Sequence, residues 1–434
     1  MQSGIHALRE SGHVSKINGL TKPSGKSQGL QRQTARRRIG LLIDSLIGGG
    51  AERVVLNLAQ SFQQLGHEVH VILVRNEIQH CLPPGIRVHA LSEDGHPLRN
   101  KLFNRLLLAW RLDRLVARIE QGGGAFDFFI SNAEDADRIS RLAGLPKVFI
   151  RYRNSMAEYL QSKIGHRTGL KRLWHSLKWH HHFRAIYGDR HIVTVSDAMQ
   201  DDIVRGAGVV PRSMRTIYNP FDFDAIRMAG EAFVPALAQP YIVYVARFSR
   251  RKRQDVLLQA FAQSAAARTH KLVLIGDAYT DSEKHWLAQT QELIATLGLT
   301  DRVVLPGFQQ NPYPWIRHAE LFAMSSDSEG LPTVLIEALI LGTPVVSTDC
   351  PTGPSEILTG TLSPWLCQRD DPAALADLID NALQDYPPIV EATLARFSAR
   401  YAATQYLRHC CAPARHSPSA ERKRLLRRSA WWAG

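Results

Sequence analysis

Short apolar runs recur along the first half of the chain, each followed by a polar loop and a stretch with helical spacing. The runs occupy residues 38–44, 66–74, 126–131, 147–151 and 191–196. Strands that alternate with helices in this way are typical of a parallel sheet covered on both faces. Each run ends in polar residues at its carboxyl end, the edge where open α/β sheets bind ligands.

A second series of the same kind begins after a stretch punctuated by Pro220, Pro235 and Pro240. Its runs occupy residues 241–245, 272–276, 302–306, 321–324 and 344–347. A chain of 434 residues also favours two domains over one very large core. We therefore predict two similar α/β domains, joined by a linker near residues 220–240.

The segment 326–338 places two carboxylates around a Gly-Leu-Pro turn that leads into an apolar helix. The start of a helix offers unpaired backbone N–H groups and the positive end of the dipole, which suit a phosphate. Glu329 and Glu337 would accept hydrogen bonds from hydroxyl groups on either side of that phosphate. The pattern favours a nucleotide-sugar site. The simpler alternative is that Glu337 is an exposed helix residue and Glu329 a loop carboxylate.

Two further motifs follow predicted strands. Glycines 48–50 let the backbone approach a ligand closely, although a plain flexible loop is an equal interpretation. The cationic run 247–253 follows the first strand of the second series, where it could neutralise a diphosphate. Its alternative is a solvated charge run. It lacks the interleaved aromatic residues of a nucleic-acid surface, so we expect no nucleic-acid partner.

Composition narrows the range of partners. The chain carries 53 Lys and Arg against 40 Asp and Glu, a net charge of +13, which indicates an anionic partner. Its 5 cysteines show no metal-type spacing and fit a reducing compartment. The longest apolar candidate, 333–346, contains Glu337 and Pro344 and is too short to span a bilayer. Residues 1–35 lack the apolar core of a secretory signal and are expected to form a disordered basic leader.

Taken in order, the glycine loop, the cationic pair and the two glutamates resemble the retaining GT-B-fold glycosyltransferases of the large bacterial E-x7-E family, of the glycosyltransferase family 4 type. Glu329 and Glu337 match the E-x7-E motif, and residues 49–53 look like the family's glycine loop. Arg247 and Lys252 stand where the family has its diphosphate-binding pair. The resemblance covers residues 36–410.

The resemblance implies an α/β protein of the GT-B class, with two Rossmann-like parallel-sheet domains facing each other across a cleft. The expected parts are the leader 1–35, an acceptor-side domain 36–220 and a nucleotide-sugar-binding domain 221–397. A C-terminal helix within 398–412 would return to the first domain, followed by a basic, tryptophan-containing tail 413–434.

The same resemblance assigns roles to individual residues. Glu329 would contact hydroxyls of the donor sugar, Glu337 the ribose, and Arg247 with Lys252 the diphosphate as charge builds on the leaving nucleotide. These residues and Arg153 form the predicted catalytic set. The predicted donor-binding set comprises Gly49, Gly50, Arg247, Lys252, Pro306, Gly307, Phe308, Glu329, Gly330, Leu331, Thr333 and Glu337.

One segment departs from the family pattern. Many members carry a histidine in the first domain that reaches the donor sugar near the reacting carbon. Arg153 and Asn154 stand where a His-Asn pair would be sought. Either Arg153 takes over that contact or the corresponding segment is a different one, so the role of this stretch stays open.

The implied reaction transfers a hexose or N-acetylhexosamine from a nucleotide-sugar with retention of configuration and without a divalent metal or other cofactor. Family habit favours a uridine diphosphate donor, and guanosine diphosphate-mannose is the alternative. Basic residues mix with Leu and Trp in 102–119, 163–190 and 422–432, as in segments that lie on membranes. We therefore expect a peripheral enzyme on the cytoplasmic membrane face, with a lipid-linked precursor of lipopolysaccharide, capsule or exopolysaccharide as acceptor.

Two other functions compete with this one. A GT-B-fold nucleotide-sugar epimerase or hydrolase would consume the donor without any acceptor. A non-catalytic basic protein would bind anionic surfaces or nucleic acid with steep salt dependence and would tolerate Glu329→Gln.

Overall fold

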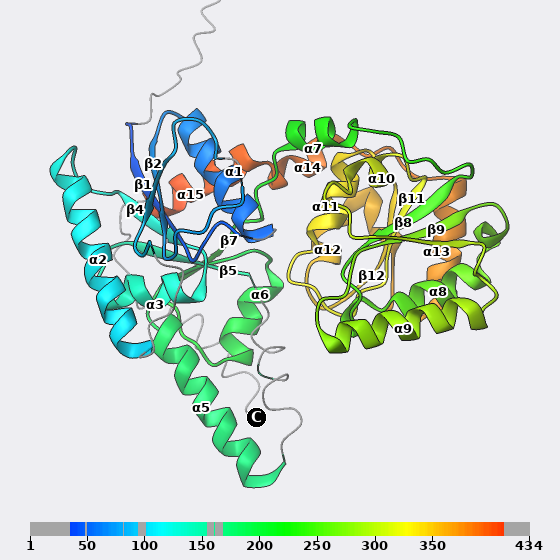
Figure 1. Cartoon of the computed structure of the whole chain (residues 1–434), viewed down its shortest axis with the longest axis horizontal. Coiled ribbons are helices and arrows are strands. Elements are labelled where there is room, and N and C mark those ends of the chain that lie inside the picture. Colours follow the sequence, from blue (N-terminus) through cyan, green and yellow to red (C-terminus); the bar gives the residue numbers. More distant parts are fainter. Residues whose placement is uncertain are drawn as a thin grey trace, which may run out of the picture. The chain divides into compact units, whose positions relative to one another are not determined.

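The computed structural model describes residues 35–47, 50–80, 82–93, 101–153, 160 and 168–411, of which 101 and 102 are described by their backbone alone. The described residues form two parallel sheets with helices packed around them (Figure 1). The tail 413–434 and the leader up to residue 34 lie outside the described residues.

The first sheet has the strand order β3-β2-β1-β4-β5-β6-β7, and every pairing is parallel. Its central strands are buried on both faces, which explains their continuous apolar runs. The strands are β1 Arg38–Ile43, β2 Glu68–Leu73, β3 Arg87–Ala90, β4 Phe128–Ser131, β5 Val148–Tyr152, β6 His191–Thr194 and β7 Ser213–Thr216.

The second sheet has the order β10-β9-β8-β11-β12-β13 and is also parallel throughout. Its strands are β8 Tyr241–Val245, β9 Lys271–Ile275, β10 Val303–Gly307, β11 Leu321–Met324, β12 Val345–Thr348 and β13 Leu366–Cys367. The prediction of two parallel-sheet domains is confirmed. In each sheet the strand order changes direction at the centre, between β1 and β4 in the first sheet and between β8 and β11 in the second. Open α/β sheets bind ligands at the carboxyl ends of the strands beside such a point.

Helices cover both sheets, and loops connect them to the ends of the strands. In the first part they are α1 Gly50–Gln64, α2 Lys101–Gln121, α3 Glu134–Leu142, α5 Gly169–Tyr187 and α6 Ala198–Asp201, which continues as a π-helical turn over Asp202–Gly206. In the second part they are α7 Phe223–Gly230, α8 Gln254–Gln263, α9 Asp281–Thr296, α10 Tyr313–Arg317, α11 Thr333–Ile340, α12 Pro354–Ile357, α13 Pro372–Gln384, α14 Glu391–Leu394 and α15 Ala399–Cys410.

Three strands escaped the sequence prediction. β3 and β7 lie at the two edges of the first sheet, and β13 is the two-residue edge of the second. Their residues are half-buried or exposed, so they show no continuous apolar run. An edge strand has one unpaired side and needs less apolar cover, which is why its sequence resembles a loop.

The last helix, α15, packs against the first sheet rather than the second. Tyr406 is fully buried, and its ring lies 6.4 Å from that of Phe62 on α1 in an edge-to-face arrangement. Just before α15 the chain passes beside the connection that leaves β7. There the Phe221 N–H donates to the Phe397 carbonyl, and the Ala399 N–H donates to the Phe221 carbonyl, each at 2.9 Å. The two connections between the sheets are therefore hydrogen-bonded to each other.

Helix α2 contains the first of the basic, apolar segments singled out from sequence. Leu108, Leu112 and Val116 on α2 are buried in the core of the first sheet. Phe103 and Trp110 are more than half exposed on the same helix. The helix thus packs on the sheet through one face and leaves a second apolar face uncovered. In the described part of the chain, no helix is long and apolar enough to cross a membrane.

A buried carboxylate in α3 makes the stability of the fold pH-dependent. Asp137 is 4% exposed, and its Oδ1 atom has no hydrogen-bond partner among the described residues. Burial raises the pKa of Asp137 from its ordinary value of 3.8 to about 7. The folded state therefore keeps a proton that the unfolded chain loses. The stronger proton binding of the folded state stabilises the protein fully below about pH 4, and this contribution to the free energy of unfolding is lost progressively as pH rises toward 7.

We accordingly expect Asp137→Asn to stabilise the protein in alkaline conditions. At about 1.4 kcal/mol per pKa unit, the gain in unfolding free energy at pH 8 should be about 2–4 kcal/mol and should approach zero near pH 4. Urea unfolding at both values measures it. The exposed Asp113→Asn on α2 is the matched control, and a gain of equal size at both pH values would contradict this origin.

Candidate functional site

Glu329 and Lys252 meet at the carboxyl edge of the second sheet. Glu329 lies in the loop between β11 and α11, and Lys252 ends the short turn Arg250–Lys252 that follows β8. The Lys252 Nζ atom lies 2.5 Å from Glu329 Oε1, with side-chain exposures of 21% and 13%. Ser326 Oγ donates a second hydrogen bond to the same oxygen at 2.6 Å. The Lys252 ammonium and the Glu329 carboxylate therefore form a partly buried ion pair.

The turn that carries Lys252 is held by buried hydroxyl groups. Ser325 Oγ donates to the Lys252 and Arg253 carbonyls at 3.1 and 2.8 Å. The fully buried Tyr244 hydroxyl contacts Ser326 Oγ at 2.8 Å and donates to the Lys252 carbonyl at 3.2 Å. These bonds tie the turn to the loop of Glu329, so Lys252 and Glu329 keep their relative positions.

The cationic run 247–253 divides into residues of different kinds. Arg253 bonds to the carboxylates of Asp255, Asp327 and Asp370, which makes it a structural link between loops. Arg247 is 61% exposed at the carboxyl end of β8, and its nearest carboxylate oxygen, on Glu283, lies 3.6 Å away. Of these two arginines, Arg247 is the one available to a ligand, and the interpretation of the whole run as solvated charge is wrong for Arg253.

Glu337 lies within α11, on the C-terminal side of the Glu329 loop, and its side chain is half-buried rather than exposed. The Tyr313 hydroxyl donates to Glu337 Oε1 at 3.0 Å, and Arg53 Nη1 donates to that hydroxyl oxygen at 2.7 Å. Burial raises the pKa of Glu337, and the Tyr313 hydrogen bond and the Arg53 charge oppose this in part. The result is a relay of three side chains that runs from α1 through α10 to α11.

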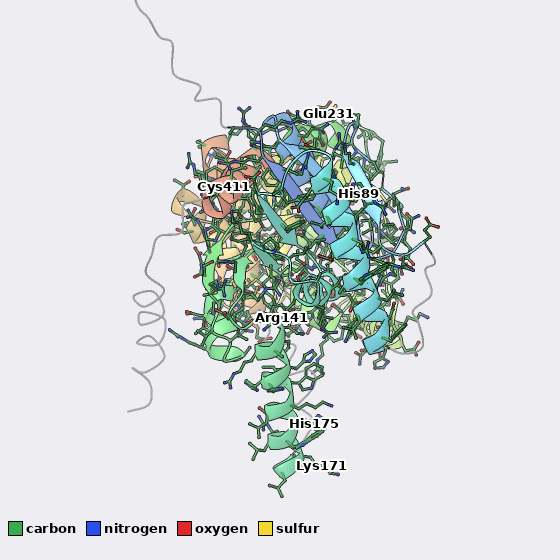
Figure 2. The ribbon with its side chains drawn as sticks, turned by 90° about the vertical axis from the view of Figure 1, so that its left-hand side faces the viewer. His89, Arg141, Lys171, His175, Glu231 and Cys411 are labelled. Atoms are coloured by element: carbon green, nitrogen blue, oxygen red, sulfur yellow. The ribbon has the colours of Figure 1, made fainter. Side chains whose placement is uncertain are left out.

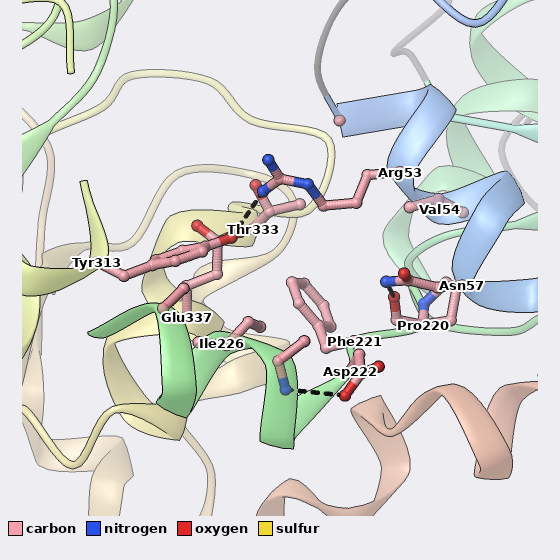
Figure 3. A pocket seen from close by; sticks show the side chains of 13 residues that line it. Arg53, Val54, Asn57, Pro220, Phe221, Asp222, Ile226, Tyr313, Thr333 and Glu337 are labelled. Atoms are coloured by element: carbon pink, nitrogen blue, oxygen red, sulfur yellow. Dashed lines mark hydrogen bonds between the residues drawn. The ribbon is translucent and has the colours of Figure 1, made fainter. Parts of the chain in front are cut away.

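This relay borders a pocket of about 270 Å³ (Figure 3). Figure 3 shows Arg53 reaching toward the Tyr313 hydroxyl, with the Glu337 side chain next to the Tyr313 ring. Apolar side chains line most of the remaining wall, and a few polar groups converge on it, as in sites for small molecules. The lining residues are Gly50, Arg53, Val54, Asn57, Pro220, Phe221, Asp222, Ala225, Ile226, Ala229, Tyr313, Thr333 and Glu337.

Gly330 occupies a position where a side chain would not fit. A Cβ atom there would lie 2.7 Å from the Arg153 carbonyl oxygen. The Gly-Leu-Pro turn thus passes directly against the backbone of the segment in which the family histidine was sought. Arg153 itself is half-buried, and Asn154 lies outside the described residues.

Two family models match the chain in succession. The model described as Glycosyltransferase Family 4 matches residues 48–225, and the one described as Glycosyl transferases group 1 matches residues 231–400. The chain is a glycosyltransferase of the GT-B fold. The predicted fold is confirmed, and so is the prediction of a glycosyltransferase, whereas the match tests neither the sugar transferred, nor the stereochemistry, nor the roles of individual residues.

Individual proteins resemble this glycosyltransferase over most of its length. The N-acetylgalactosamine-N,N'-diacetylbacillosaminyl-diphospho-undecaprenol 4-alpha-N-acetylgalactosaminyltransferase of Campylobacter jejuni is 26% identical over 351 residues, which cover 80% of this chain and 91% of the relative. A glycosyltransferase structure from Rickettsia africae aligns with a TM-score of 0.65 at 17% identity, covering 88% of this chain and all of that one. The Anabaena protein HepE, solved with UDP and glucose, aligns with a TM-score of 0.56 at 22% identity, covering 85% and 95%.

The glycosyltransferase brings some of the sequence-predicted residues together and leaves others apart. Gly50, Thr333 and Glu337 line one pocket, and Lys252 contacts Glu329. Leu331 is buried in the turn between them. Pro306, Gly307 and Phe308 lie at the end of β10, with Phe308 62% exposed, and none of the three lines that pocket. Gly49 lies outside the described residues.

Sequence reasoning missed the residues that join the two halves of the glycosyltransferase. Tyr313 had no signal in the sequence, and Arg53 entered only as the last residue of the predicted glycine loop 49–53, with no role of its own. Glu356 on α12 accepts hydrogen bonds from the Asp197 and Ala198 N–H groups at 2.7 and 3.0 Å, at the start of α6. No cluster of His, Cys, Asp and Glu that could hold a metal ion occurs among the residues that the structure describes.

Proposed function

We propose that this glycosyltransferase moves a hexose or N-acetylhexosamine from a nucleotide-diphosphate sugar, with retention, to a lipid-linked precursor of a cell-surface glycan. The single observation that carries the proposal is the Lys252–Glu329 pair beside the start of α11, with Glu337 in a pocket further along the same segment. A cation, a helix start and two carboxylates match the phosphates and hydroxyls of a nucleotide-sugar.

In this proposal each group acts on one part of the donor. Glu329 accepts hydrogen bonds from sugar hydroxyls, and Glu337 accepts them from the ribose. Lys252 and Arg247 hold the diphosphate and stabilise the negative charge that develops on it as the glycosidic bond breaks. Cationic side chains then supply the charge that a divalent metal provides in other transferases. Arg153 stays a candidate for the contact made by the family histidine.

The donor is proposed to be a UDP-sugar. The Anabaena protein, which shares the fold of this chain, was solved with UDP. UDP is therefore the first nucleotide to test. GDP-mannose is the alternative. We propose that residues 36–220 form the acceptor-side domain and that residues 221–397 form the donor-side domain. A helix within 398–412 returns to the first of these domains.

The acceptor is proposed to be an intermediate of lipopolysaccharide, capsule or exopolysaccharide synthesis. The Campylobacter jejuni relative acts, by its name, on a diphospho-undecaprenol-linked sugar. An acceptor of that kind sits in a membrane, and the net charge of +13 suits an anionic surface. We therefore propose a peripheral location on the cytoplasmic face of the membrane.

A donor-consumption assay tests the reaction class. The purified full chain is incubated with UDP-glucose, UDP-N-acetylglucosamine, UDP-N-acetylgalactosamine or GDP-mannose, with and without undecaprenyl-diphosphate-linked sugars. We expect UDP release that depends on acceptor, with a product whose anomeric proton in NMR shows the configuration of the donor. Equal UDP release without acceptor indicates a hydrolase, and a converted donor sugar indicates an epimerase. An inverted product contradicts retention.

A further inference from the structure

Helix α5 carries two apolar faces at different positions along its length. In its C-terminal half, Phe183, Ile186 and Tyr187 are buried and join the core of the protein. In its N-terminal half, residues 168–174 are exposed on every side of the helix. The helix is thus anchored at one end and projects at the other. Figure 2 shows this half, with Lys171 and His175 labelled, extending beyond the other drawn elements.

The exposed half of α5 has an apolar face of its own. Leu170, Leu173, Trp174 and Leu177 are 85%, 58%, 59% and 62% exposed. Residues spaced by three, four and seven positions lie on one side of an α-helix. The centre of the buried set at 183, 186 and 187 is displaced around the helix by roughly 140°, given 100° per residue. The exposed residues are therefore not the continuation of the buried stripe.

Charge around this face has a single sign. Lys171 and Lys178 lie together along one edge of the exposed apolar residues, and Arg172 lies toward the opposite side of the helix. The Lys178 ammonium lies 5.2 Å from the centre of the Trp174 ring. No acidic residue occurs between 169 and 187. A surface that combines Leu and Trp with cations and lacks carboxylates matches the interface of a bilayer that contains anionic lipid.

The size of this face also favours a membrane over a protein partner. Four side chains on one helical stretch offer a few hundred Å² of apolar surface, whereas stable protein interfaces bury roughly 1,200–2,000 Å² in total. A projecting helix end can enter the headgroup region of a bilayer without any complementary shape. Each buried apolar side chain then contributes by leaving water, and each lysine contributes by its attraction to the surface.

We propose that residues 170–178 of α5 insert into the interface of a membrane that carries anionic lipid. The insertion holds the enzyme at the surface where a lipid-linked acceptor resides, and this last step rests on the function proposed above. The contact itself stands on α5 alone and does not depend on the identity of donor or acceptor.

Vesicle sedimentation with the full chain tests the contact. The probes are vesicles of phosphatidylglycerol and phosphatidylethanolamine, and neutral vesicles of phosphatidylcholine. We expect the wild type to bind the anionic vesicles with a partition coefficient that falls as salt rises, since exposed charges are screened. Leu173→Glu combined with Trp174→Glu should lower that coefficient at least about tenfold, because two large apolar contacts are replaced by repelled charges.

Matched controls separate this effect from changes in charge or folding. Val234→Glu combined with Val390→Glu adds the same charge at apolar side chains that are 72% and 54% exposed in the second half of the chain, and should bind as the wild type. Calorimetric titration with UDP reads the donor site independently. Lost vesicle binding with unchanged UDP binding supports α5 as the contact. Lost vesicle binding with no UDP binding by any variant leaves α5 supported and rejects UDP as the donor nucleotide.

Three results would overturn the proposal. The α5 variant could bind anionic vesicles as well as the wild type does, which would place the contact elsewhere. The wild type could bind neutral vesicles equally well, which would remove the role of charge. Sedimentation velocity could show a wild-type dimer that the α5 variant abolishes while vesicle binding is unchanged, which would assign this face to a second copy of the chain.

Discussion

Lys252→Ala is expected to lower the turnover of the glycosyltransferase by about 10²–10³-fold, the loss seen when one preorganised donor to a developing anion is removed. Lys252 Nζ contacts Glu329 at the carboxyl edge of the second sheet, and its side chain is only 21% exposed. A positive charge fixed there acts more strongly than one in water, because fewer solvent dipoles screen it. The measurement is kcat for donor consumption at saturating donor and acceptor.

The fold should survive this change. Ser326 still donates to Glu329, and the turn is held through the Lys252 backbone carbonyl rather than its side chain. Arg250→Ala, in the same turn and exposed, is the matched control and should change kcat by no more than about twofold. Equal losses in both variants, or no loss in Lys252→Ala, would rule out Lys252 as the charge that stabilises the leaving group.

Glu337→Ala is expected to raise the KM for the donor by about 10–100-fold, with a smaller change in kcat. A hydrogen bond that involves a charged group is worth about 1.5–3 kcal/mol, and about 1.4 kcal/mol corresponds to a factor of ten in affinity. Glu337 points into the pocket, whereas the reacting groups are predicted around Glu329, so the loss should fall on binding. Steady-state kinetics with varied donor concentration separate the two constants.

Tyr313→Phe is expected to change the pH dependence of donor binding at Glu337. The Tyr313 hydrogen bond lowers the pKa of Glu337, which burial raises. Without the hydroxyl the pKa of Glu337 should rise further, so donor binding should decline at a higher pH than in the wild type as pH falls. Tyr279→Phe, at a hydroxyl on a side chain that is 56% exposed, is the control. An identical pH profile for Tyr313→Phe and the wild type would show that the hydroxyl does not tune Glu337.

The sequence was most informative where function depends on neighbours in the chain. Glu329, the Gly-Leu-Pro turn and Glu337 lie within one segment, so their spacing around the start of α11 could be predicted. The central strands of both sheets were predictable for the same reason, since burial on both faces makes them continuously apolar.

Contacts between distant segments could not be predicted from one sequence. Arg53 and Tyr313 are 260 positions apart, and only the packing of α1 near α10 brings them together. Lys252 and Glu329 were each singled out, but their mutual contact was not predicted, because it depends on the adjacency of β8 and β11. Helix α5 shows a further limit. Its two sets of apolar residues, at 170–177 and at 183–187, follow one another in the sequence, and only their exposure shows which set is packed in the core and which projects.

Calorimetric titration of UDP and of GDP into the wild type and Glu337→Ala tests the central claim most directly, because it reads donor binding at Glu337 without needing the acceptor. The account predicts saturable binding of UDP to the wild type at one site per chain, and binding at least about tenfold weaker in Glu337→Ala. If GDP alone binds saturably and its affinity falls by the same factor in Glu337→Ala, the site assignment stands and the donor is a GDP-sugar. Unchanged affinity in Glu337→Ala, or no binding of either nucleotide to the wild type, would contradict a nucleotide-sugar site at Glu337.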